Sequence, residues 1–138
     1  MKLLDTEIVK KQFISASWKA VKIGFDLIEI HGTHGYLLHQ FLSPISNKRK
    51  DKYGGSLENR MRFPLEVFSS VKKTLPKDFP LGMRITGTDW EINGINEDEA
   101  SIFAKELEQI GCHYVCVSSG GNTPSPKIPL GPHYQVHL

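Results

Sequence analysis

FDLIEIHGTHGY, residues 25–36, contains the pattern around which the rest of this 138-residue chain is organised. In its first half apolar and polar side chains alternate, with Ile28 and Ile30 on one side and Glu29 and His31 on the other. A period of two residues is typical of a β-strand. A turn punctuated by glycines follows at once and carries two more ring side chains. The stretch therefore predicts a strand whose carboxyl end presents a histidine to a polar turn.

Three helices and two more strands are predicted around this strand. Asp5 is the expected cap of the first helix, which should end at Gly24, whereas Ser56 and Asn96 are the expected caps of the other two. Gly111 should end the last helix. The predicted elements are helices over residues 5–23, 56–75 and 97–110, and strands over residues 25–31, 81–86 and 114–118.

The order helix, strand, helix, strand, helix, strand predicts an α/β fold with a parallel sheet built from right-handed β/α units. In such folds the functional groups gather at the carboxyl ends of the strands. The three predicted strands end in polar residues, at His31, at Arg84 to Thr86, and at Ser118 to Gly121. Residues 32–55 are read as a loop, and a loop of that length is usually functional or disordered. We expect one domain over residues 1–138 with its site on loop 32–55.

Composition excludes several classes of protein. The net charge of +2 is too small for a nucleic-acid-binding surface, and the only basic cluster, in residues 48–52, is interrupted by Asp51. No segment is long and apolar enough to cross a bilayer, and the N-terminus lacks a secretory signal. We therefore expect a cytoplasmic protein with no nucleic-acid or membrane partner. Cys112 and Cys116 are expected to be buried, reduced thiols.

His31, His34 and Tyr36 form the strongest chemical feature of the sequence, because one strand delivers two imidazoles and a phenol into one turn. Two histidines placed in this way could donate hydrogen bonds to a carbonyl or nitro oxygen on which negative charge develops. The tyrosine could supply a proton. The competing interpretation is structural, since a single histidine is more often a hydrogen-bonded structural residue.

A zinc site is a second alternative for this turn, because His31 and His34 with Glu29 are common zinc ligands and would suit a zinc hydrolase. Histidines at this spacing are most persuasive as metal ligands on a helix, and the neighbouring glycines argue against a helix here. We therefore expect no metal.

Arg84 lies within an apolar strand, where an unpaired charge would cost several kcal/mol, so it needs an anionic or electron-rich partner. One candidate is the N1–C2=O edge of a flavin, where a cation stabilises the reduced, anionic ring. The alternative is a buried ion pair with Glu29 or Asp89.

Three stretches carry a resemblance to a known family. The run HGTHGYLLHQFLSPISNKRKDKYGGSLENRMRF, residues 31–63, closely resembles the signature of old yellow enzyme homologues, especially the bacterial-type NADH:flavin oxidoreductase branch. LGMRITGTDW, VSSGGN and NTPSPKIPLGPHYQV are similar to later segments of that family. The resemblance covers essentially the whole chain.

The resemblance implies a (β/α)8 barrel that binds FMN, takes hydride from NADH or NADPH, and reduces activated C=C bonds of α,β-unsaturated carbonyl or nitro compounds. On that basis His31 and His34 match the pair that binds the substrate's oxygen, and Tyr36 matches the proton donor. Arg84 matches the arginine that faces the flavin pyrimidine.

A complete barrel needs about 250 residues, so the resemblance implies a central fragment, a partial TIM (β/α)8 barrel of about three β/α units. The strands that bring a glutamine and a small or thiol residue to the flavin are expected upstream, and the FMN phosphate cradle downstream. As an isolated fragment the chain is expected to be inactive, to bind FMN weakly, and to self-associate through its open sheet edges. The alternative is a non-catalytic remnant or an interaction module without cofactor.

Overall fold

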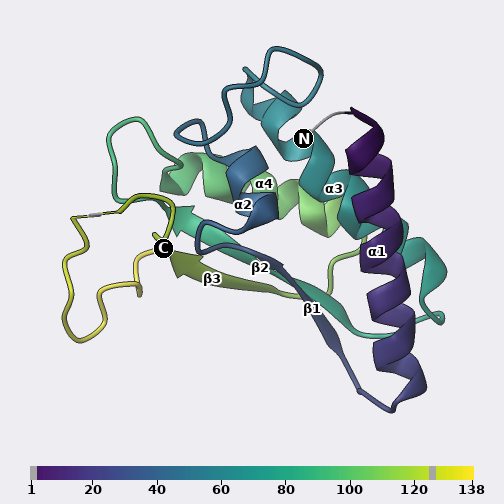
Figure 1. Ribbon diagram of the computed structural model, residues 1–138. Coiled ribbons are helices and arrows are strands. Elements are labelled where there is room, and N and C mark those ends of the chain that lie inside the picture. The colour runs from purple at the N-terminus through teal and green to yellow at the C-terminus, as the bar shows by residue number, and fades with distance from the viewer. Residues whose placement is uncertain (1–2, 125–126) are drawn as a thin grey trace.

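The computed structural model describes residues 3–124 and 127–138. Its centre is a three-stranded parallel sheet in the order β1-β2-β3. Figure 1 shows the helices gathered on one side of this sheet, with the other face uncovered by any described helix. The elements in chain order are α1 (Leu3–Lys22), β1 (Ile28–Gly32), α2 (Leu37–Leu42), α3 (Leu57–Thr74), β2 (Leu81–Thr88), α4 (Glu97–Gln109) and β3 (Val115–Ser119).

The hydrophobic core lies between the sheet and the helices. On β2 the residues that face the helices are Leu81, Met83 and Ile85, all at most 1% exposed. Their register partners on β1 include Ile28 and Ile30, so one apolar stripe crosses both strands. Large side chains from the helices close the core, among them Phe63, Val67 and Phe68 of α3 and Phe103 and Leu107 of α4. This packing leaves the alternate, polar residues of the strands on the open face.

Two of the predicted caps are confirmed. The Ser56 side chain accepts a hydrogen bond from the Asn59 amide at 3.3 Å, and the Asn96 side chain accepts from the Glu99 amide at 3.0 Å. Each contact satisfies an amide that the first helical turn leaves unpaired. The predicted parallel α/β arrangement is also confirmed.

Other boundaries differ from the sequence-based prediction. α1 begins at Leu3, so Asp5 lies within the first turn and is not its cap. β1 begins at Ile28 because its pairing with β2 begins there, at Leu81, and residues 25–27 are exposed.

Residues 32–55 are not one continuous loop. They contain α2, a helix of six residues whose Leu38, Phe41 and Leu42 are buried. A helix this short has little stability without tertiary packing, and α2 obtains that packing against the core.

Both cysteines are free, as expected. Cys112 and Cys116 are only half-buried, however, so the prediction that they are buried was wrong. No helix within residues 3–124 and 127–138 has the length and apolar character needed to span a membrane.

Candidate functional site

The end of β1 and the middle of β2 bring a histidine and an arginine together. His31 and Arg84 are register partners in the β1–β2 pairing, so their side chains point to the same face of the sheet. That face is the one without a described helix (Figure 1). The candidate site is therefore an open, polar surface at the carboxyl end of the sheet.

The turn after β1 adds two rings to His31. The ring centroid of His34 lies 5.2 Å from that of His31, and the centroid of Tyr36 lies 5.3 Å from it. His31 is exposed, and Tyr36 is 64% exposed. The structure thus brings together the three residues that the sequence singled out, with His31 and Tyr36 exposed and His34 partly exposed.

His34 is held from two directions by the end of β3. Its Nε2 lies 2.7 Å from the Ser118 hydroxyl oxygen. Its backbone is left-handed, with φ of 56°, which is uncommon for a residue other than glycine. Gly121 packs directly against it, since a Cβ at position 121 would lie 2.6 Å from the His34 Cα. Any larger residue at position 121 would push the turn away.

The surroundings of His34 favour its neutral form. Burial has the largest effect and lowers the pKa of His34, and electrostatic interaction with His31, Arg84 and His39 lowers it further. The usual value is 6.5, so the ring is predominantly neutral at pH 7. With Nε2 bonded to Ser118, the Nδ1 atom is left for one further partner.

The environment of Arg84 differs from the buried position that the sequence predicted. Its side chain is 39% exposed, so it is not a buried charge, and its Nε donates to Glu29 Oε1 at 2.8 Å. This hydrogen bond raises the pKa of Arg84. Of the two carboxylates considered as partners, Glu29 forms the ion pair. Asp89 lies in a separate, buried cluster.

Tyr114 covers part of the open face of the sheet, next to β2. Its ring lies across Gly82, where an added Cβ would come within 2.3 Å of the ring. Burial raises the pKa of the Tyr114 phenol, and the nearby carboxylate of Glu29 raises it further. The position of the Tyr114 ring therefore requires glycine at position 82, and the raised pKa keeps the phenol protonated.

Sequence reasoning missed three residues around the turn. Ser118 was noted only as part of a polar strand end, and its contact with His34 was not foreseen. His39 and Asp89 were not assigned to the site, although the His39 Nε2 lies 2.9 Å from Asp89 Oδ1 and both side chains are 0% exposed. The available signal was a histidine inside the apolar run LLHQFL and an aspartate directly after a strand.

The hypothesis of a zinc site is not supported by any cluster of ligands in the part of the chain that the structure describes. No group of three or more His, Cys, Asp or Glu side chains there is arranged to hold a metal ion. Glu29, the third ligand of that hypothesis, is paired with Arg84.

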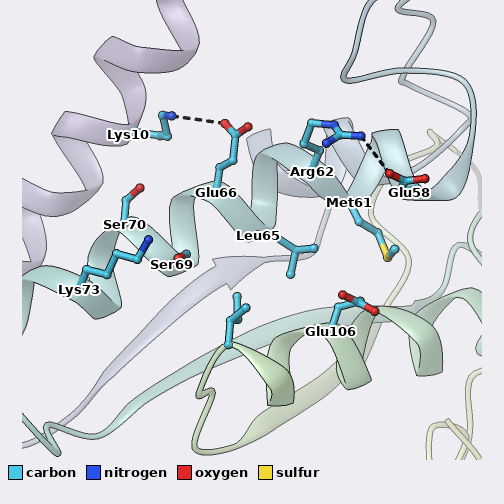
Figure 2. Close-up of a pocket in the computed structure, with 11 residues that line it drawn as sticks. Lys10, Glu58, Met61, Arg62, Leu65, Glu66, Ser69, Ser70, Lys73 and Glu106 are labelled. Atoms are coloured by element: carbon cyan, nitrogen blue, oxygen red, sulfur yellow. Dashed lines mark hydrogen bonds and ion pairs between the residues drawn. The ribbon is translucent and has the colours of Figure 1, made fainter.

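A separate groove lies on the helical side of the molecule, among α1, α3 and the end of α4. Figure 2 shows Lys10 of α1, several residues of α3 and Glu106 of α4 around it. Four of its charged side chains form ion pairs, since Lys10 Nζ lies 3.3 Å from Glu66 Oε2 and Arg62 Nη2 lies 3.2 Å from Glu58 Oε1. Helices and core separate this groove from the open face with His31, so it is not part of the candidate site.

Comparison with solved structures supports the fold. The chain superposes on 2-naphthoyl-CoA reductase, in a complex with 2-naphthoyl-CoA, with a TM-score of 0.85 and 32% identity over 93% of this chain and 20% of that one. It is also similar to histamine dehydrogenase from Rhizobium sp. 4-9, with a TM-score of 0.80 and 29% identity over 88% of this chain and 18% of that one. The three β/α units are thus a partial (β/α)8 barrel, as predicted.

Sequence comparison identifies the family. The chain is 44% identical to an NADH:flavin oxidoreductase of Gibberella zeae over 97% of its own length and 35% of the relative's. It is 42% identical to an NADPH dehydrogenase of Geobacillus sp. (strain WCH70), over 96% of this chain and 38% of that one. The chain therefore spans a little over a third of the length of these relatives. Residues 1–122 match the profile of the NADH:flavin oxidoreductase / NADH oxidase family, to which this chain therefore belongs.

Proposed function

We propose that the chain supplies the substrate-binding, flavin-facing wall of an FMN-dependent NAD(P)H oxidoreductase that reduces activated C=C bonds. The observation behind this proposal is the register pairing of His31 with Arg84 on the open face, beside His34 and Tyr36. The substrates are α,β-unsaturated carbonyl or nitro compounds, whose oxygen atom gains negative charge as the alkene is reduced.

Arg84 fits the edge of a flavin ring. Its Nε is anchored by Glu29, whereas its Nη groups make no hydrogen bond within residues 3–124 and 127–138. A guanidinium held in this way presents a planar pair of donors, which suits the adjacent N1 and C2=O acceptors of the isoalloxazine ring. Bound FMN would supply the redox chemistry, accepting hydride from NAD(P)H and delivering it to the β-carbon of the alkene.

The histidines and Tyr36 would act on the substrate. Ring N–H groups of His31 and His34 donate hydrogen bonds to the carbonyl or nitro oxygen, which lowers the energy of the negative charge that develops there. Tyr36 then gives its phenolic proton to the α-carbon, next to the activating group. Hydride on the β-carbon and a proton on the α-carbon together complete the two-electron reduction of the alkene.

As a separate chain, this wall would bind FMN weakly and show no turnover, because the family's phosphate cradle is expected outside it. Both outer strands also have a free edge in the part of the chain that the structure describes. Free parallel edges can pair with another chain, so we propose that the isolated chain self-associates through them.

The flavin-facing role of Arg84 is tested by titrating the isotope-labelled chain with FMN and following side-chain NMR signals. We expect the guanidinium signals of Arg84 and the imidazole signals of His31 to shift at millimolar FMN. Arg84→Met should weaken binding about tenfold, which is the loss expected for a charge-assisted hydrogen bond. Addition of 2-cyclohexenone, a simple activated alkene, should shift the signals of His31 and His34.

Arg62→Met is the matched control, because Arg62 is also paired with a glutamate but belongs to the groove on the helical side. It should leave FMN binding unchanged. Equal losses in the two variants would contradict the proposal. A purified chain that is yellow with stoichiometric flavin would contradict weak binding, and a complete absence of flavin-induced shifts would favour a remnant without cofactor.

A further inference from the structure

A buried histidine and aspartate lie directly beneath the turn that carries His34 and Tyr36. His39 belongs to α2 and Asp89 follows β2, and neither side chain is exposed to solvent. The proposed chemistry uses neither of them. Their contacts explain how a short glycine-containing turn can hold two side chains in place.

The contacts of His39 define which of its ring nitrogens carries the proton. The backbone amide of Gly35 donates to Nδ1 at 2.9 Å, and the Thr86 hydroxyl oxygen lies 3.3 Å from the same atom. Because the amide can only donate, Nδ1 must be the acceptor. Nε2 then carries the proton and faces Asp89 Oδ1 at 2.9 Å. A proton on Nδ1 would set two donors against each other, because a backbone amide cannot accept a hydrogen bond in place of donating one.

Asp89 is fixed as an ionised acceptor by its own partners. Burial would raise its pKa, but contacts with His39 and with the Ser43 hydroxyl outweigh this effect and lower the pKa. Ser43 Oγ donates to Asp89 Oδ2 at 2.6 Å, and the Ile95 amide donates to the same oxygen at 2.9 Å. The carboxylate therefore joins the end of α2 to the loop between β2 and α4.

Gly35 links this buried pair to the site. It lies between His34 and Tyr36 with φ of 74°, and an added Cβ would come within 2.1 Å of the Gly121 carbonyl oxygen. Gly121 contacts the turn on one side, and His39 receives the Gly35 amide on the other. The direction of that amide sets the backbone from which both flanking side chains project.

We propose that Asp89 and His39 are positioning residues for the turn: Asp89 selects the Nε2–H tautomer of His39, and His39 holds the Gly35 amide. The benefit to catalysis rests on the proposed function, but the series of contacts from Asp89 through His39 to the Gly35 amide does not. It can be tested without flavin or substrate, so its failure and the failure of the flavin proposal are distinguishable.

The unmodified chain provides the first test, by NMR of 15N-labelled histidine. The 15N chemical shifts should identify His39 Nδ1 as the unprotonated nitrogen and Nε2 as the protonated one. A 15N–15N coupling through the hydrogen bond should connect the Gly35 amide with His39 Nδ1. Protonation of Nδ1 would overturn the proposal whatever any variant does.

Asp89→Asn provides the second test, because asparagine has one oxygen that accepts hydrogen bonds whereas aspartate has two. The Ile95 amide is a fixed donor, so the Asn oxygen should remain on that side and the amide nitrogen should face His39 Nε2. The tautomer of His39 should then reverse and leave the Gly35 amide without its acceptor. We expect exchange of the Gly35 amide with solvent to become about tenfold faster, as for a lost hydrogen bond.

A readout at the site separates positioning from simple loss of stability. In Asp89→Asn the pKa of His34 should rise toward its usual value, because a loosened turn exposes the ring to water. Ser43→Ala is the matched control, since it removes another hydrogen bond to Asp89 without altering the His39 tautomer. It should lower stability but leave Gly35 exchange and the His34 titration unchanged. Identical responses of the two variants would overturn the proposal.

Discussion

His34 is affected by burial and by several neighbouring side chains, and all of these influences lower its pKa. Burial has the largest effect, and electrostatic interaction with His31, Arg84 and His39 acts in the same direction. The neutral ring can donate one hydrogen bond to a substrate oxygen without adding a positive charge near Arg84. The position of the His34 ring therefore determines both its charge and the number of hydrogen bonds that it can donate to a substrate.

His31→Gln should raise the pKa of His34, because His31 exerts the largest of the electrostatic effects on that ring. The pKa should still remain below 6.5, since burial is the largest influence and does not change. Titration of the imidazole carbon and proton signals by NMR measures the shift directly. His113→Gln is the control, because His113 contacts Lys72 and Leu81 at the far end of the sheet. A His34 pKa unaffected by His31→Gln would refute this electrostatic coupling.

Helix α4 shows how a single cap determines where an element begins. Asn96 has extended backbone angles and its side chain accepts from the Glu99 amide. The first turn also holds Glu97, Asp98 and Glu99, whose charges are favourable near the amino end of a helix. The helix then presents Ala100, Phe103 and Leu107 to the core.

Asn96→Ala should lower the free energy of unfolding by about 1 kcal/mol, the usual contribution of an N-cap. Urea denaturation followed by circular dichroism measures this change. Asn93→Ala is the control, because Asn93 is exposed in the preceding loop and caps no helix. The cap would have no special role if the two substitutions had equal effects.

At the scale of the whole molecule, the sheet has a covered face and an open one. Helices and core protect the first, whereas the second exposes His31 and half-exposes Arg84. Within residues 3–124 and 127–138, the two outer strands, β1 and β3, each pair with β2 only. An open face and two unpaired strand edges suit one wall of a larger barrel. In the separate chain, these edges can pair with another copy.

Sedimentation velocity should therefore show association that increases with protein concentration. Val117→Lys should weaken it about tenfold or more, because a lysine on an edge strand opposes edge-to-edge pairing. Ile102→Lys provides the comparison, since Ile102 is similarly exposed, at 45% against 40%, but lies on α4. Association that persists unchanged in Val117→Lys, or that is lost equally in both, would exclude the β3 edge as the contact.

The sequence alone predicted the parallel β/α order, the caps at Ser56 and Asn96 and the family, because these depend on local periodicity, hydrogen bonding within one turn and contiguous motifs. It also selected His31, His34, Tyr36 and Arg84, whose chemical roles stay predictions. The sequence did not predict the short helix α2, because a helix of six residues depends on tertiary packing for its stability.

Only the tertiary structure decided which partners these side chains have. Ser118 contacts His34 across 84 positions of sequence, and Arg84 is paired with Glu29 across 55. The buried pair of His39 and Asp89 likewise joins α2 to the end of β2. Such contacts depend on strand register and on which face each residue occupies, and a one-residue shift of register would reverse every face. Local sequence carries no information about register between distant strands, so the environment of the site became visible only in the folded chain.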